Sequence, residues 1–125
     1  MNKVIELAGR ILLGHIFLLA GINKISGYEG TAGYMEAMGV PGALLPLVIV
    51  LEIAGGLALI VGFKTKWAAL ALAGFTVLAA VLFHADFSDQ TQMILFMKNW
   101  AITGGLLMVY VYGAGEISMD RKLGH

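Results

Sequence analysis

Four long apolar segments, separated by short polar stretches, dominate the hydrophobicity pattern of this chain. The segments cover about residues 4–25, 43–63, 67–83 and 92–113. A helix needs about 20 residues to cross the ~30 Å hydrocarbon layer of a membrane, so each segment is long enough for one crossing. The pattern predicts an all-α fold, a four-helix membrane bundle with short loops, as one domain over residues 1–125. The longer first loop, residues 26–42, has room for an interfacial helix over about 31–38.

The composition of the chain favours the same class of protein. Of its 125 residues, 59% are hydrophobic and 13% are charged, and the mean hydropathy is +0.86. So few polar residues do not cover the surface of a water-soluble globule of this size. The formal net charge is zero and Lys and Arg form no cluster, which argues against nucleic acid as a partner. The chain has no cysteine, so we expect any redox role to use a bound cofactor.

The first apolar segment is the weakest of the four, because its uncharged part covers only residues 11–23. A signal peptide is the alternative interpretation, with Lys3 and Arg10 as its basic region and residues 11–20 as its apolar core. Glu6 is unusual in such a region, and no A-x-A-like cleavage site follows. We therefore expect a membrane span.

The basic residues outside the apolar segments predict the orientation of the chain. Four crossings place most of them on one side of the membrane: Lys3, Lys64, Lys66, Arg121 and Lys122. The loops on the opposite side are acidic, with Lys24 at their edge, and carry Glu29, Glu36, Asp86 and Asp89. Because loops rich in Lys and Arg remain in the cytoplasm, both termini are expected to be cytoplasmic.

A few ionisable side chains lie inside the apolar segments, and charged groups in hydrocarbon are costly unless they find partners. With a rise of 1.5 Å per residue, His15, Glu52 and Lys98 fall within roughly one helical turn of the same depth. Arg10 lies about one turn closer to the cytoplasm, and its long side chain can reach toward Glu52. We therefore predict a ligand-binding layer with a rim at the outer surface. The layer comprises Arg10, His15, Glu52, Lys98 and Asn99, and the rim comprises Lys24, Tyr34 and His84.

Two interpretations of this layer stay open. An ion pair of Glu52 with Lys98 or Arg10 would only fix the register of the helices. A polar pocket among Phe, Met and Leu would instead suit the head group of an amphiphile such as a quinone. A haem between His15 and His84 is not expected, because their depths differ by about nine residues, or ~14 Å. No metal site is predicted either, since His84 and Asp86 lack further ligands.

Paired glycines mark the second and fourth segments, as Gly55-Gly56 and Gly104-Gly105. Glycine on a membrane helix allows a neighbouring backbone to approach closely, so we expect helix contacts at these positions. The matching pairs hint at a repeat in which the first two spans resemble the last two.

Short motifs follow one another in a characteristic order along the four segments: Gly9-Arg10, Leu13, Phe17, Ala20-Gly21, Lys24, Gly39-Val40-Pro41, Glu52, Gly55-Gly56, Gly62, His84, Lys98-Asn99 and Gly104-Gly105-Leu106. Over about residues 4–113 this arrangement resembles the DoxX family of small bacterial inner-membrane proteins. The resemblance implies a multi-pass four-helix bundle in the inner membrane and an association with membrane oxidoreductases. The family name comes from a subunit linked to thiosulfate and quinone oxidation, but fold alone does not transfer that activity to a chain without cysteine.

Two functional hypotheses follow. The first is a quinone-binding or redox-associated membrane subunit with no intrinsic cofactor, in which a Lys or Arg donates a hydrogen bond to a quinone carbonyl. Its expected partners are membrane lipid, a quinone or another amphiphile, and either a second copy of the chain or a membrane oxidoreductase. The alternative is a non-catalytic scaffold, assembly factor, or small-solute or proton carrier, in which the buried charges fix helix register or relay a proton. The sequence leaves open whether the chain catalyses a reaction.

Overall fold

The computed structural model describes residues 2–83, 88–115 and 117–124, and this part of the chain contains helices and no strand. The elements are α1 (Asn2–Ser26), α2 (Tyr28–Ala37), the short 3-10 turn η1 (Gly42–Leu44), α3 (Leu45–Val61), α4 (Thr65–Phe83), α5 (Gln90–Tyr112) and α6 (Met119–Leu123). Four segments are long and apolar enough to cross a membrane: α1, α3 together with η1, α4, and α5. The predicted all-α four-helix membrane bundle is confirmed, and α2 occupies the loop in which an interfacial helix was expected.

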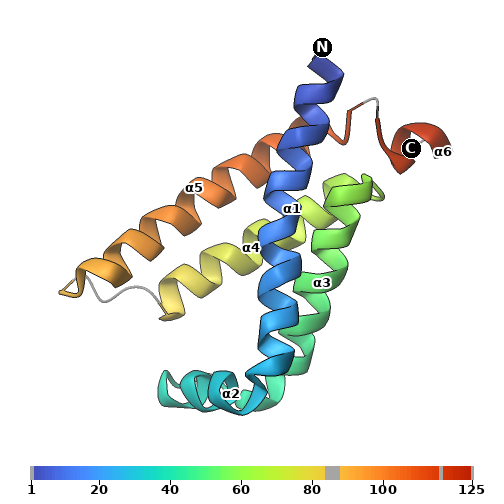
Figure 1. Ribbon diagram of the computed structural model, residues 1–125. Coiled ribbons are helices and arrows are strands. Elements are labelled where there is room, and N and C mark those ends of the chain that lie inside the picture. Colours follow the sequence, from blue (N-terminus) through green and yellow to red (C-terminus); the bar gives the residue numbers. More distant parts are fainter. Residues whose placement is uncertain (1, 84–87, 116, 125) are drawn as a thin grey trace.

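The long helices form two pairs that cross at an angle (Figure 1). Helices α1 and α3 run side by side, and α4 and α5 form the second pair. Helix α2 lies across one end of the first pair, which we call the α2 end. The start of α1, the α3–α4 turn and α6 lie at the opposite end, which we call the terminal end.

Glycines bring α1 and α3 into backbone contact. A Cβ atom on Gly14 would lie 2.7 Å from the carbonyl oxygen of Gly56, and a Cβ on Gly56 would lie 2.7 Å from that of Gly14. The predicted close approach at Gly56 is therefore confirmed. On α5, Gly105 faces Leu13 of α1, whereas a Cβ on Gly104 would meet nothing within 4 Å among the described residues.

The buried core lies where the two helix pairs cross. Its side chains come from α1, α3, α4 and α5 and are Phe17, Leu59, Ala69, Leu72, Ala73 and Leu106. A smaller cluster of Met35, Leu45 and Ile49 attaches α2 to the start of α3. Large apolar side chains also cover the outside of the long helices, as they must where lipid is the solvent. The core therefore stabilises the crossing of the two helix pairs, and the buried charged side chains Arg10 and Glu52 lie to either side of it.

Candidate functional site

A cavity of about 320 Å³ lies between the two helix pairs toward the α2 end, with walls from all four long helices and α2. Its walls are mainly apolar and include Phe17, Met35, Phe75, Ala79 and Ile102. One ion pair interrupts them: Lys24 Nζ on α1 lies 2.8 Å from Glu52 Oε1 on α3. Tyr34 and Asn99 add further polar groups to the lining. The arrangement is that of a small-molecule site, an apolar hollow with a few polar groups.

The two partners of the ion pair are buried to different extents. The side chain of Glu52 is 4% exposed, and that of Lys24 is 27% exposed. In a medium of low dielectric constant the two charges attract strongly, and each compensates the other. Lys24 is therefore the more accessible partner of the pair.

The spacing of residues along α1 explains why Lys24 reaches Glu52. Steps of four, three, four and three residues place one set of positions on a single face of the helix: Arg10, Gly14, Phe17, Gly21 and Lys24. The first four of them are the buried residues of α1. Gly21 leaves no room for a Cβ against Glu52 and Ile53, so α1 lies close to α3 where the pair forms. Lys24 was expected at the rim and not as the partner of Glu52, although this periodic face of α1 indicates the pairing.

The expectation that Arg10 reaches toward Glu52 is wrong. Arg10 is buried, with 3% of its surface exposed, and its guanidinium donates to two backbone carbonyls instead. Nη1 donates to Leu59 in the last turn of α3 at 3.3 Å, and Nη2 donates to Ile117. Carbonyls in the last turn of a helix lack an intrahelical donor, so the carbonyl of Leu59 is available to accept from Arg10.

Gly62 makes the position of Arg10 sterically accessible. It ends α3 with a φ of +73°, and a Cβ there would collide with the Arg10 guanidinium and with Ser118. Its carbonyl also accepts the backbone N–H of Asp120 at 2.7 Å, which fixes α6 beside the α3–α4 turn. The terminal end is thus assembled around Arg10.

The predicted single layer does not form, because Lys98 and His15 point away from Glu52. Lys98 is exposed and does not line the cavity, whereas Asn99 does. With 3.6 residues per helical turn, neighbouring residues point about 100° apart, so only one of the two can face inward. His15 is also exposed, and its Nδ1 donates to the carbonyl of Leu12 on the same helix at 2.6 Å. The geometry therefore brings together Lys24, Glu52 and Asn99.

Two of the predicted rim residues line the cavity, namely Lys24 and Tyr34. The third, His84, and its neighbour Asp86 lie outside the residues that the structure describes. The cavity is thus bounded by α2 through Tyr34 and Met35, of which Met35 is buried. Helix α2 forms part of the wall in addition to lying across the end of the bundle.

Comparison with known proteins gives a consistent result. The model of the DoxX family matches residues 5–85. The inner membrane protein YqjF of Escherichia coli K12 is 53% identical over 98% of this chain and 95% of its own length. The inner membrane protein YphA of the same strain is 34% identical over 97% of this chain and 91% of its own. A protein of Bacillus subtilis named "Putative oxidoreductase CatD" is 28% identical over 83% of this chain and 84% of its own. No solved structure matches this chain.

Proposed function

This chain belongs to the DoxX family and is a multi-pass inner-membrane protein, and from that premise we propose that it binds the head group of a membrane quinone in the cavity near the α2 end. The observation that carries the proposal is the Lys24–Glu52 ion pair in the wall of an otherwise apolar hollow. A charged pair that served only to hold two helices together would need no cavity beside it. Of the layer predicted from the sequence, Glu52 and Asn99 line the cavity, and the predicted rim residues Lys24 and Tyr34 join them.

The chemistry of the lining fits a quinone ring. The ring is flat and apolar on its faces and carries two carbonyl oxygens that accept hydrogen bonds. The Lys24 ammonium has three donors, and the contact with Glu52 uses one of them. A carbonyl oxygen can accept another, and Phe17 and Phe75 supply apolar surface for the ring. The cavity volume of about 320 Å³ falls at the small end of the range for ligand sites, roughly 300–1,000 Å³.

The electrostatics of the pair favour the reduced form of such a ligand. Reduction places negative charge on the quinone oxygens, and an ammonium held in position beside them stabilises that charge. Glu52 holds Lys24 in position and balances its charge while the cavity is empty. The pair therefore combines a stable resting state with a donor that faces the ligand.

We assign the chain a redox-associated role in which it holds the quinone and a membrane oxidoreductase partner supplies the electrons. The similarity to CatD, whose name includes an oxidoreductase assignment, supports this association. The basic residues gathered at the terminal end support an orientation with both termini in the cytoplasm. In that orientation the quinone cavity lies in the outer half of the membrane.

Equilibrium binding of decylubiquinone to the protein in lipid nanodiscs tests the proposal. Glu52→Gln removes the charge that holds Lys24, and Lys24→Met removes the donor, so each should weaken binding by tenfold or more. Lys98→Met removes a cation at similar depth on the exposed face of α5, and it should bind the quinone as the wild type does. Equal affinities in all four proteins would contradict the proposal.

Mass spectrometry of small molecules retained after gentle purification gives an independent readout. The wild type should retain a native quinone that the Glu52→Gln variant loses while it keeps the melting temperature of the wild type. If the wild type retains no quinone and Glu52→Gln unfolds the protein, the pair fixes helix register and the alternative scaffold function holds.

A further inference from the structure

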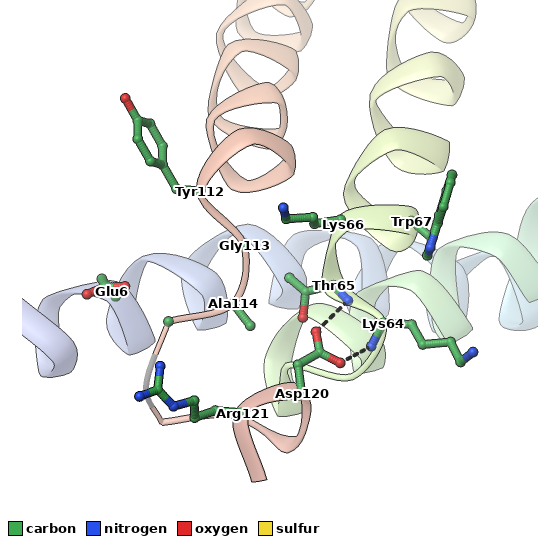
Figure 2. A pocket seen from close by; sticks show the side chains of 11 residues that line it. Glu6, Lys64, Thr65, Lys66, Trp67, Tyr112, Gly113, Ala114, Asp120 and Arg121 are labelled. Atoms are coloured by element: carbon green, nitrogen blue, oxygen red, sulfur yellow. Dashed lines mark hydrogen bonds between the residues drawn. The ribbon is translucent and has the colours of Figure 1, made fainter. Parts of the chain in front are cut away.

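Two short helices lie at opposite ends of the molecule, and they are attached in different ways. Helix α6 at the terminal end is fixed by hydrogen bonds. The Asp120 carboxylate accepts the backbone N–H groups of Lys64 and Thr65, shown by dashed lines in Figure 2. The backbone N–H of Asp120 also donates to the carbonyl of Gly62 at 2.7 Å. Displacing α6 would therefore break several hydrogen bonds at once.

The contact of α2 with the bundle centres on one apolar side chain. Met35 is the one buried residue among the ten of α2, all of which the structure describes, and it packs against Leu45 and Ile49 of α3. Ala32 adds a partly buried contact to this cluster. In the described part of the chain, the backbone hydrogen bonds that flank α2 stay within residues 23–40. Helix α2 therefore relies on a small apolar contact where α6 relies on hydrogen bonds.

The sequence of α2 also makes this helix easy to unwind. Gly30 and Gly33 lie in its interior, and a Cβ atom at either position would meet nothing within 4 Å among the described residues. Close packing therefore does not require glycine there, although each glycine makes a helix less stable than alanine would. A helix of ten residues is also too short to be stable without its tertiary contacts. The local stability of α2 should therefore be low compared with that of the long helices.

One face of α2 closes the proposed quinone cavity. Thr31, Tyr34 and Met35 all line the cavity, and their spacing of three and four residues places them on one side of the helix. Met35 thus belongs both to the cavity wall and to the cluster that attaches α2 to α3. A movement that withdraws Met35 from this cluster would open the wall.

We propose that α2 is a gate for the cavity, a role that rests on the proposed function for the identity of the ligand. The structure shows the closed position, in which Met35 is buried. The gate opens when α2 unwinds and separates from the start of α3, and the quinone head group then enters or leaves. The main core at the crossing of the helix pairs shares no buried residue with the Met35 cluster, so the long helices stay packed during opening. Elements that admit ligands are generally drawn from the least stable parts of a protein.

Stopped-flow binding of decylubiquinone to the protein in nanodiscs measures the rate at which the gate opens. Gly30→Ala/Gly33→Ala stabilises α2 without a steric clash, so the association and dissociation rate constants should both fall by about five- to thirty-fold, from a factor of roughly two to five per glycine. Kd should stay at the wild-type value, because the closed helix is the same in the free and the bound protein. Gly74→Ala on α4 is the matched control, since its Cβ also meets nothing within 4 Å among the described residues, and it should leave both rate constants unchanged.

A disulfide provides a second, reversible lock on α2. The chain has no cysteine, and a Cβ atom on Gly42 would lie 3.4 Å from the Cβ of Ala32, close to the separation of about 3.5–4.5 Å found in disulfides. The carboxylate of Glu36 would lie 2.7 Å from the new Cβ, and as the end of a flexible side chain it can turn aside. Oxidised Ala32→Cys/Gly42→Cys should exchange decylubiquinone at least tenfold more slowly than its reduced form. The two forms share one sequence, so a folding defect would affect both.

Hydrogen exchange of the ligand-free protein in nanodiscs tests the gate without quinone. The amides of α2 should exchange at least tenfold faster than those in the middle of α3, and Gly30→Ala/Gly33→Ala should slow the exchange of α2 alone. Equal protection of α2 and α3 would overturn the proposal. Equal quinone rates in the oxidised and reduced forms of the cysteine variant would also overturn it, as would a Gly74→Ala variant slowed as much as the alanine variant of α2. A wild type that binds no decylubiquinone would instead contradict the proposed function, and hydrogen exchange would still decide whether α2 opens.

Discussion

The two ends of the α1–α3 pair each contain a buried charge, and the two charges are treated differently. Arg10 and Glu52 are both 3% exposed. At the terminal end, Arg10 donates to backbone carbonyls of Leu59 and Ile117, which come from separate parts of the chain. At the α2 end, Glu52 is paired with one side chain, Lys24, beside an open cavity.

This difference separates a structural charge from a candidate binding charge. The Arg10 guanidinium joins α1, the end of α3 and the C-terminal segment, and Gly62 closes against it. The partner of Glu52 is more than a quarter exposed and can change its hydrogen bonds without moving a helix. Equal burial of two charged groups therefore says little about their roles. The nature of the partner, backbone or side chain, distinguishes them.

The largest effect is expected from Arg10→Met. The substitution removes two hydrogen bonds from a charged donor, each worth about 1.5–3 kcal/mol, so the free energy of unfolding should fall by about 3 kcal/mol or more. Titration with SDS in mixed micelles measures it, with Lys98→Met as the control for removing an exposed cation from a span. Quinone affinity of the folded fraction should stay at the wild-type value. A stable variant that fails to bind quinone would reverse the two roles.

Gly56→Ala should have the next largest effect and should disturb both ends. Its Cβ would meet the backbone of Gly14 and Leu18, which are unable to rotate aside, so α1 and α3 must separate. Overpacking of this kind typically costs about 1–3 kcal/mol. The matched control is Gly104→Ala on α5, where a Cβ meets nothing within 4 Å among the described residues. If both variants unfold at the same SDS fraction, the close contact of α1 and α3 does not couple the two ends.

The sequence was sufficient for the depth of each polar residue, but not for its direction around the helix. Hydropathy identified the four spans, and the rise per residue placed Glu52 and Lys98 at a similar depth. It could not show that Lys98 faces outward and Asn99 inward, because that depends on how α5 packs against the other pair. The partners of Arg10 could not be predicted from the sequence either, because Leu59 and Ile117 accept through their backbone carbonyls and their side chains are apolar.

Asp120→Asn tests whether the terminal end depends on side-chain capping as well as on Arg10. Asp120 accepts two backbone N–H groups from the first turn of α4, and an Asn offers only one oxygen. Loss of an N-terminal cap costs about 1 kcal/mol, so unfolding in SDS should occur slightly earlier. The matched variant is Asp89→Asn at the start of α5, which keeps an oxygen to accept the backbone N–H of Thr91 and should change stability less. If Asp89→Asn lowers the free energy of unfolding more than Asp120→Asn does, capping by Asp120 does not stabilise the terminal end.

The smallest change in stability, and the sharpest test of the comparison, is expected from the double variant Lys24→Met/Glu52→Leu. Replacing a buried ion pair by apolar side chains of similar size is often neutral or stabilising by about 1–4 kcal/mol, because the desolvation of both charges disappears. The free energy of unfolding should therefore stay within about 1 kcal/mol of the wild type or rise, while decylubiquinone affinity is lost. A fall of about 3 kcal/mol, equal to that of Arg10→Met, would mean that the pair holds α1 to α3 as the Arg10 contacts do. The α2 end would then be as structural as the terminal end, and the cavity beside Glu52 would have no charge of its own to offer a ligand.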